Sequence, residues 1–315
     1  MLNIVFLERD SLDAEVRRPK FAHRWTEYGL LPQEELADNL AAADIVSVNK
    51  MKLGADVLSR LPRLRMIAVA ATGTDNVDIA CCRERGIVVS NIRNYAVHSV
   101  PEHAFALILA LRRNLFAYCA DVAAGLWGRS ERFCLSGHEI GDLHGSTLGI
   151  VGEGALGQGA AQIARGFGMR VLFADHAPPK APQVAYTPFE QVLCEADVLT
   201  LHLPLTDATR HLIGARELGM MKKNALLINT ARGGLVEESA LVEALDNGVI
   251  AGAGFDVLSV EPPANGNVLL ETPRHNLIVT PHIAWASRGA RQALADQLMD
   301  NIEAFAAGVP RNLLT

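Results

Sequence analysis

A glycine-rich turn between a buried strand and a helix constrains the fold of this 315-residue chain more than any other feature. Residues 147–151 read Thr-Leu-Gly-Ile-Val, an apolar run typical of a buried strand, and Gly152-Glu-Gly154-Ala-Leu-Gly157 follows directly. A helical pattern then runs to Phe167, and the next apolar strand ends at Asp175. The glycine pattern alone is weak evidence. In this order of strand, turn, helix, strand and acid, it predicts a Rossmann dinucleotide-binding fold.

Each glycine of the turn has a physical role in that fold. Gly152 permits the tight turn, Gly154 lets the backbone approach a pyrophosphate, and Gly157 lets the helix pack closely on the strand. The amides of Ala155 and Leu156 then face the pyrophosphate at a helix N-terminus, where the helix dipole favours an anion. The alternative is a glycine turn that serves packing alone.

Asp175 bears on the choice of cofactor. At the end of the second strand, its carboxylate can accept hydrogen bonds from a ribose 2′-hydroxyl and would repel a 2′-phosphate. We therefore predict NAD rather than NADP as the cofactor. A solvated acid at a strand end is the alternative interpretation of Asp175.

Short apolar strands alternate with helical patterns along the whole chain, which predicts an α/β fold with parallel sheets. The length favours two domains. Because the glycine turn lies mid-chain, the domain that it opens begins near residue 100, and the first hundred residues form another domain. Two helices mark the joints: one opens at Ser99, with a predicted capping box to Glu102, and one starts after Ser287.

Composition and charge exclude several classes of protein. The net charge of −6 comes from interspersed charges of both signs, so there is no basic surface for nucleic acid or for an anionic membrane. The first 20 residues lack the pattern of a signal peptide, and the longest apolar run, Ala104–Leu111, is too short to span a bilayer. Five scattered cysteines fit neither a disulfide framework nor a metal site, which predicts reduced thiols in the cytoplasm and no bound metal.

Polar residues follow the later apolar strands, where open α/β sheets bind their ligands. They are Asp175, Thr230-Ala231-Arg232, Asp256 and His282. Such clustering of polar residues beyond apolar strands predicts a site at this edge of the sheet.

The reduction of a ketone by hydride also needs a proton donor and an anchor for the carboxylate. Among the ten histidines, His282 is the best placed donor, while His98, His103 and His202 remain alternatives. Arg232 can clamp a carboxylate through two hydrogen bonds and polarise the adjacent carbonyl. Glu261, in the loop between the last two strands, can stabilise a charged imidazole, although a surface acid is the alternative interpretation.

The sequence resembles the D-isomer-specific 2-hydroxyacid dehydrogenases over essentially its whole length. The matching blocks are Ala71-Thr-Gly-Thr-Asp-Asn-Val-Asp78, Gly152–Gly157, Leu201-His-Leu-Pro-Leu-Thr206, Ile228-Asn-Thr-Ala-Arg-Gly-Gly234, Asp256, Glu261-Pro-Pro263 and Thr280-Pro-His-Ile-Ala-Trp285. Together these blocks are highly specific.

The resemblance implies a division of labour in the site. Arg232 would bind the carboxylate and carbonyl of the substrate, Glu261 would orient the histidine, and His282 would donate the proton. The cofactor-binding residues would include Asp256, the backbone of Thr230 and Ala231, and Trp285. The backbone of Thr72 and Gly73 would hold the substrate carboxylate, whereas Lys50 faces either the substrate or the solvent.

The resemblance also implies two doubly wound parallel-sheet domains that close around the reactants. A Rossmann NAD-binding domain, residues 99–285, would be inserted into a flavodoxin-like substrate domain formed by residues 1–98 and 286–315. The segment from Asn114 to His144 would be an arm that embraces a second subunit, which makes a homodimer.

Within the family, the Thr-Gly-Thr-Asp-Asn block and Trp285 look most similar to the glycerate dehydrogenases, or hydroxypyruvate reductases. This similarity implies the interconversion of a small 2-keto acid and its D-2-hydroxy acid, with hydroxypyruvate or glyoxylate giving D-glycerate or glycolate. Alternatives are an NAD-sensing, corepressor-like binding protein of the same fold, another D-2-hydroxyacid dehydrogenase, or a phosphonate-oxidising relative. The last is disfavoured because no lysine adjoins Gly73.

Overall fold

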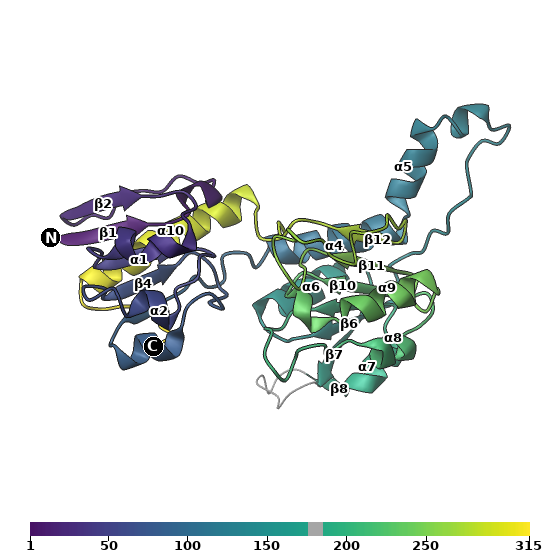
Figure 1. Ribbon diagram of the computed structural model, residues 1–315. Coiled ribbons are helices and arrows are strands. Elements are labelled where there is room, and N and C mark those ends of the chain that lie inside the picture. Colours follow the sequence, from purple (N-terminus) through teal and green to yellow (C-terminus); the bar gives the residue numbers. More distant parts are fainter. Residues whose placement is uncertain (176–184) are drawn as a thin grey trace. The chain divides into compact units, whose positions relative to one another are not determined.

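The computed structural model describes residues 1–175 and 185–315, and these residues form two compact units (Figure 1). Unit 1 combines Met1–Tyr95 with Ala286–Thr315. Unit 2 is the uninterrupted stretch Ala96–Trp285. One of the ten histidines, His176, lies outside the described residues.

Unit 1 is built on a five-stranded sheet whose strands all run parallel, in the order β2-β1-β3-β4-β5. This is the flavodoxin-like strand order, which confirms the predicted fold class. Strands β3 and β4 are buried along their whole length, as expected for a parallel sheet covered on both faces. The strands are β1 (Leu2–Phe6), β2 (His23–Glu27), β3 (Ile45–Val48), β4 (Met66–Val69) and β5 (Val88–Ser90).

The helices of unit 1 include three short ones and the long C-terminal helix α10 (Arg288–Ala306). Ser287 caps α10, because its side chain accepts a hydrogen bond from the amide of Ala290 at 3.2 Å. An apolar stripe of this helix, formed by Ala290, Leu294, Leu298 and Ile302, is buried, and the helix packs over β4. The other helical segments are η1 (Arg9–Ser11), η2 (Gln33–Glu35), α1 (Leu36–Leu40), α2 (Ala55–Leu58) and α3 (Ile79–Glu84).

Unit 2 contains a seven-stranded parallel sheet, described in the order β12-β11-β10-β9-β6-β7-β8. Counted from β6, which carries the glycine turn, this is the Rossmann order with a further strand at one edge. The direction of winding reverses between β6 and β9, the place where such folds bind dinucleotides. The strands are β6 (Thr147–Val151), β7 (Arg170–Asp175), β8 (Tyr186–Pro188), β9 (Val198–Leu201), β10 (Leu226–Asn229), β11 (Gly252–Phe255) and β12 (Leu277–Val279).

Helices cover the sheet of unit 2. Helix α4 (Ser99–Arg112) packs against α6 (Ala155–Gly166) and against β10 and β11. Its buried apolar residues therefore lie between a helix and the sheet. The other helical segments are α5 (Leu115–Ala123), η3 (Trp127–Arg129), α7 (Phe189–Glu195), α8 (Ala215–Met220), η4 (Gly233–Leu235) and α9 (Glu238–Asp246).

One helix start differs from the sequence prediction. Ser99 does not cap α4, because His98 occupies the N-cap position and the Ser99 hydroxyl donates to the carbonyl of Ala284 at 2.5 Å. The predicted capping box is therefore wrong. The hydroxyl bonds instead to a carbonyl that is distant in sequence.

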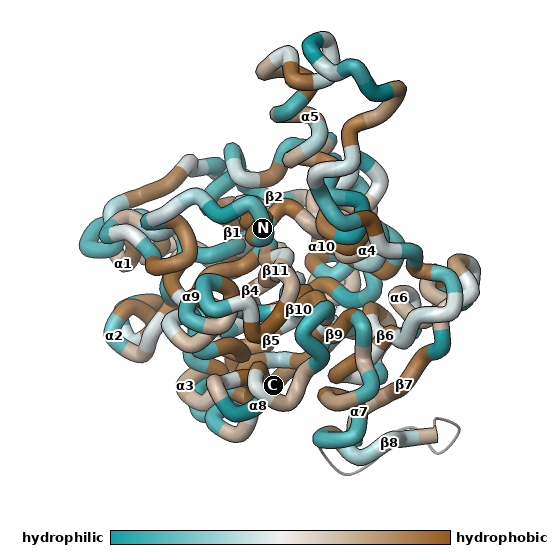
Figure 2. Tube along the Cα trace, turned by 90° about the vertical axis from the view of Figure 1, so that its right-hand side faces the viewer, coloured by the Kyte–Doolittle hydropathy of each residue, from teal (hydrophilic) through white to brown (hydrophobic). Residues whose placement is uncertain are grey.

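Beyond α4, the chain forms an arm that projects from the body of unit 2 (Figures 1 and 2). Helix α5, at its base, buries none of its residues. Among the residues that the structure describes, no helix combines the length and the apolar character needed to cross a membrane.

Candidate active site

Three neighbouring strands of unit 2 bring the predicted catalytic residues to one edge of the sheet. β10 leads into Thr230-Ala231-Arg232, β11 into Asp256, and β12 into the loop that carries His282. Because these strands are parallel and adjacent, their carboxyl ends lie side by side. The sheet therefore gathers Arg232 and His282, which are 50 positions apart in the sequence.

His282 and Glu261 form a short hydrogen-bonded pair at this edge. Their side chains lie 2.6 Å apart, from Nδ1 of the ring to Oε2 of the carboxylate, and they are 27% and 32% exposed. The other carboxylate oxygen of Glu261 accepts the amide hydrogen of Leu258 at 2.7 Å. The carboxylate is thereby fixed, and it fixes the orientation of the imidazole ring.

The backbone of His282 adopts a left-handed conformation, with φ of 55°, which is uncommon for a residue with a side chain. Asp256 holds this turn. Its carbonyl accepts the amide of His282 at 2.8 Å, and its carboxylate accepts the amides of Ile283 at 2.9 Å and Ala284 at 2.8 Å. Asp256 is only 1% exposed, so these bonds form in a buried environment and stabilise a strained turn.

Two further polar side chains, those of Thr280 and His103, are linked to Asp256. The hydroxyl of Thr280 donates to Oδ1 of Asp256 at 2.5 Å, and Nε2 of His103 lies 3.0 Å from that hydroxyl. His103 is on α4, so the helix is tied to the loop that carries His282. The sequence identified His103 only as an alternative proton donor, and it did not identify Thr280 as a positioning group.

The turn that carries Arg232 is shaped by Asn229, the last residue of β10. The buried side chain of Asn229 donates to the carbonyl of Arg232 at 2.8 Å and accepts the amide of Ala231 at 3.1 Å. Next to it, Gly233 packs so tightly that a Cβ there would lie 1.9 Å from the carbonyl carbon of Leu258. Only glycine fits, and the Arg232 turn thus contacts the segment that leads to Glu261. The sequence signal for Asn229 was a polar residue ending a buried strand.

The glycine turn after β6 has the geometry of a dinucleotide site. Gly152 has φ of 108°, and a Cβ there would lie 2.4 Å from the carbonyl oxygen of His202. A Cβ on Gly157 would lie 2.0 Å from the carbonyl oxygen of Gly152, so the strand and the helix approach too closely for any side chain. At Gly154, by contrast, a Cβ would meet open space.

This open space lies at the N-terminus of α6, where Gly154 is the N-cap and no described side chain caps the helix. The amides of the first turn, including those of Ala155 and Leu156, are therefore available to an anion. At the end of β10, Thr230 is only 8% exposed, and its hydroxyl has no hydrogen-bond partner among the described residues. A buried hydroxyl without a partner fits a bound polar group. The residues present thus fit a dinucleotide, and Asp175 ends β7 as an exposed acid.

The alternative proton donors have different surroundings. Burial lowers the pKa of His202 to about 4, so its ring is neutral near pH 7. Nε2 of this ring lies 3.0 Å from the hydroxyl of Thr200. His98 is an exposed N-cap residue of α4, and His103 is engaged by Thr280. Nε2 of His103 also lies 3.5 Å from Oδ1 of Asp256, a longer contact than the 2.6 Å pair of His282 and Glu261.

The predicted residues of unit 1 also follow strands of their sheet. Thr72 and Gly73 come after β4, and the hydroxyl of Thr72 donates to the carbonyl of Ile92 at 2.7 Å. Lys50 comes after β3 and is exposed. Its backbone amide donates to the buried carboxylate of Glu8, which also accepts the two neighbouring amides.

Comparison with known proteins agrees with this geometry. The family model "D-isomer specific 2-hydroxyacid dehydrogenase, NAD binding domain" matches residues 105–284. Most of unit 2 therefore matches a domain described as NAD-binding.

Curated and solved relatives cover nearly the whole chain. Glycerate dehydrogenase of Methylorubrum extorquens is 51% identical over 312 residues, which cover 99% of this chain and 98% of the relative. D-lactate dehydrogenase from Aquifex aeolicus, complexed with NAD and lactic acid, has a TM-score of 0.80 at 29% identity and covers 97% of this chain and 96% of its own. The NADPH-dependent glyoxylate/hydroxypyruvate reductase from Sinorhizobium meliloti has a TM-score of 0.84 at 27% identity. The match covers 100% of this chain and 98% of the reductase chain. The chain is thus an oxidoreductase that belongs to the D-isomer-specific 2-hydroxyacid dehydrogenase family.

Proposed function

We propose that the protein reduces hydroxypyruvate or glyoxylate with NADH, giving D-glycerate or glycolate. The observation that carries the proposal is the 2.6 Å pair of His282 and Glu261, two strands along the sheet from the Arg232 turn. This arrangement supplies both a proton donor and a carboxylate anchor. The glycerate dehydrogenase and the glyoxylate/hydroxypyruvate reductase among the relatives support the choice of substrates.

Arg232 is the proposed anchor of the substrate. Its guanidinium can bind the carboxylate through two hydrogen bonds and polarise the neighbouring carbonyl. In unit 1, the backbone amides of Thr72 and Gly73 are proposed as a second anchor for the same carboxylate.

His282 is the proposed proton donor. When bound, the dinucleotide would supply the hydride, and negative charge would develop on the carbonyl oxygen next to the carboxylate of the substrate. Since Nδ1 of His282 is engaged by Glu261, Nε2 is the nitrogen that gives its proton to this oxygen. The carboxylate of Glu261 stabilises the protonated ring before the transfer and holds its orientation throughout.

For the cofactor, we propose that the amides of Ala155 and Leu156, in the turn Gly152–Gly157, bind the pyrophosphate. The backbone of Thr230 and Ala231, with Asp256 and Trp285, is proposed to hold the nicotinamide end. The carboxylate of Asp256 already accepts the Thr280 hydroxyl and two amides. Because an ionised carboxylate offers about four acceptor positions, it can still accept one hydrogen from a carboxamide.

We further propose that NAD is preferred over NADP. Solved relatives include both an NAD complex and an NADPH-dependent enzyme, so the family alone does not decide the cofactor. The carboxylate of Asp175, at the end of β7, would bind a ribose 2′-hydroxyl and repel a 2′-phosphate.

A steady-state screen tests these proposals. We expect kcat/KM to be highest for hydroxypyruvate or glyoxylate among small 2-keto acids, and higher with NADH than with NADPH. Asp175→Ala should reduce the preference for NADH by about tenfold or more, mainly through a higher KM for NADH, because the hydrogen bonds to the ribose 2′-hydroxyl are lost. Asp246→Ala, which removes a carboxylate at the end of α9, should leave the preference unchanged. No turnover of either keto acid, or a preference for NADPH, would contradict the corresponding proposal.

The arm suggests a homodimer as the working form. From Asn114 to His144 it exposes large apolar side chains, among them Phe133, which is 95% exposed. Exposed apolar groups gathered on one projecting segment fit a surface that a second copy covers.

The compartment is proposed to be the cytoplasm, because Cys81, Cys82, Cys119, Cys134 and Cys194 are free thiols.

A further inference from the structure

Asn91 is a buried polar residue directly after β5, at the carboxyl edge of the unit 1 sheet. It is 6% exposed, and each of its polar groups has a partner. Its backbone amide donates to the carbonyl of Asn312 at 3.2 Å, and its carbonyl accepts Nδ2 of Asn301 at 3.0 Å. Its side-chain oxygen accepts Nε of Arg93 at 3.2 Å.

The fourth partner, Thr72, belongs to the proposed substrate site. Nδ2 of Asn91 donates to the carbonyl of Thr72 at 2.8 Å. Two further bonds join the same segments: the Thr72 hydroxyl donates to the carbonyl of Ile92 at 2.7 Å, and the Ile92 amide donates to the carbonyl of Ala71 at 3.0 Å. The chain after β4 is thus held by bonds from both backbone and side chains of the segment after β5.

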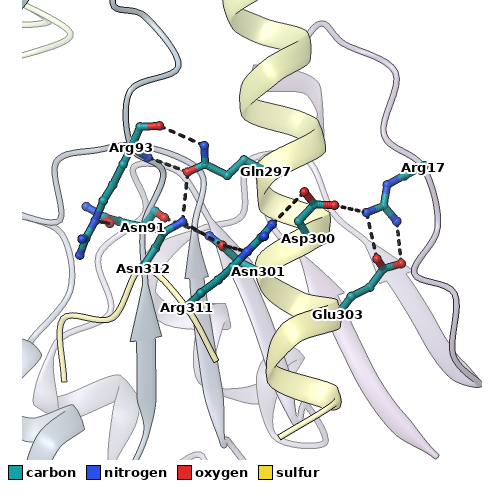
Figure 3. A network of polar contacts seen from close by, with 9 residues as sticks. All are labelled: Arg17, Asn91, Arg93, Gln297, Asp300, Asn301, Glu303, Arg311 and Asn312. Carbon is teal, nitrogen blue, oxygen red and sulfur yellow. Dashed lines mark hydrogen bonds and ion pairs between the residues drawn. The ribbon is translucent and has the colours of Figure 1, made fainter. Parts of the chain in front are cut away.

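The opposite side of Asn91 is fixed by α10 (Figure 3). Asn301, which is 1% exposed, lies on this helix, and its side-chain oxygen accepts Nδ2 of Asn312 at 3.0 Å and Nε of Arg311 at 3.2 Å. One turn earlier, the side chain of Gln297 accepts the amide of Arg93 at 2.7 Å and donates to its carbonyl at 3.0 Å. Asn91 therefore has rigid support from a long helix.

We infer that Asn91 is a positioning residue that fixes the backbone of Thr72 and Gly73 and so sets the affinity for the substrate carboxylate. The inference rests on the proposed function, in which those two amides are an anchor. The Thr72 carbonyl points into the bond with Asn91, so this bond fixes the orientation of the peptide group that bears the Gly73 amide. A buried side chain that donates to Thr72 and accepts from Arg93 must carry a hydrogen-bond donor and a hydrogen-bond acceptor, as an amide does.

Asn91→Asp is the sharpest test, because it keeps the shape and replaces the donor with an oxygen that faces the Thr72 carbonyl. We expect KM for the keto acid to rise about tenfold or more, with kcat within about threefold and KM for NADH within about twofold, since ground-state and transition-state binding are weakened alike. Thr72→Val removes the hydrogen bond from the Thr72 hydroxyl to Ile92 with little change of shape, and it should also raise KM for the keto acid.

Asn3→Ala is the matched control. Its side-chain amide likewise donates to a carbonyl, that of Ala42 at 3.0 Å, but before β3 at the amino edge of the same sheet. It should leave KM for the keto acid unchanged. A merely structural role of Asn91 would lower Tm in Asn91→Asp without changing this KM, and that result would overturn the inference.

Hydrogen exchange of the segment 71–74 provides a readout that does not depend on turnover. We expect its amides to exchange about tenfold faster or more in Asn91→Asp than in the wild type, and at the wild-type rate in Asn3→Ala. Unchanged exchange in Asn91→Asp would refute the fixing of this backbone. If the wild type reduced no keto acid while exchange still accelerated, the proposed function would fail, but the fixed backbone would stand.

Discussion

At the scale of single residues, His282 combines a strained backbone with the short hydrogen bond to Glu261. A left-handed residue with a side chain persists only where the surroundings stabilise it, and here Asp256 does so with three hydrogen bonds. In this backbone conformation, the ring points toward Glu261 at the edge of the sheet. Asp256 therefore acts on the histidine as well as on the proposed nicotinamide site.

Loss of the proton donor should collapse the chemical step. We expect His282→Ala to lower kcat for keto acid reduction by about 10²–10⁴-fold, the usual effect of a positioned general acid. Binding of NADH, measured by the quenching of tryptophan fluorescence, should be retained, because the glycine turn after β6 lies elsewhere on the sheet. Glu261→Gln should lower kcat at neutral pH by a smaller factor, since a neutral amide still orients the ring but stabilises its charge less.

His98→Ala is the comparison for this experiment, because His98 is an exposed histidine of the same unit. It should retain wild-type kcat. A near wild-type kcat in His282→Ala would contradict this role, and the donor would then have to be sought at His98, His103 or His202. The low pKa of His202, about 4, already argues against that residue as a carrier of a proton near pH 7.

The sequence could predict His282, Glu261 and Arg232 as a group because parallel strands place their carboxyl ends together. It could not predict Asn91, because the partners of that residue are Thr72 on one side and Asn301, 210 positions away, on the other. Such side-chain contacts depend on how the elements pack. For the same reason, the tie between His103 and Thr280 had no signal in the sequence.

At the scale of elements, ion pairs connect α10 to the N-terminal part of unit 1. Arg17 bonds to Asp300 at 2.5 Å and to Glu303 at 2.6 Å, both on α10 (Figure 3). The hydrogen bond from Arg17 lowers the pKa of Glu303. The pKa of Asp300 is lowered as well: burial tends to raise it, but the bonds to Arg311 and Arg17 outweigh this effect.

These shifts predict a pH-dependent contribution to stability. Because both carboxyl pKa values are lower in the folded state, the stabilisation is present above the ordinary carboxyl range and is lost as the pH falls through the lowered values. We expect Arg17→Met to lower Tm at pH 7, and the difference from wild type to shrink toward pH 3. A calorimetric series between these pH values measures it.

Arg18→Met is the control for the pH series, since Arg18 makes a more exposed pair with Glu27 at 3.2 Å. Its effect on Tm should be smaller at every pH, because exposed pairs contribute little. A difference for Arg17→Met that stayed constant down to pH 3 would contradict the electrostatic explanation.

Most elements were predictable from apolar runs, but β2 and β8 were not. β2 has the sequence His-Arg-Trp-Thr-Glu and lies at the edge of its sheet, so it lacks the apolar run of a buried strand. β8 is a three-residue edge strand that ends in proline. Edge strands are covered less than central ones, and their sequences carry a weaker signal.

At the scale of the whole molecule, the arm predicts self-association. Light scattering should give a particle of about twice the 33.9 kDa of the chain. We expect the double variant Trp127→Ser and Phe133→Ser to raise the dimer Kd by about tenfold or more, since buried aromatic residues dominate many interfaces. A stable particle of single-chain mass in the wild type at micromolar concentration would refute the dimer.

Leu30→Ser is the control for the arm variant. Leu30 is 76% exposed but lies in unit 1, away from the arm in the sequence. It should leave the Kd unchanged. An equal effect in both variants would show that the loss of any exposed apolar residue, rather than the arm, changes the association.

The discontinuity of unit 1 sets an order of events during protein synthesis. Unit 2 is one uninterrupted stretch, whereas unit 1 needs α10, which packs over β4, and the segment around Leu313, which pairs with Ser90. Both of these pieces leave the ribosome after all of unit 2. The sequence of unit 2 is therefore complete before that of unit 1, and the N-terminal strands of unit 1 must wait for α10 and the segment around Leu313 before their own unit is complete.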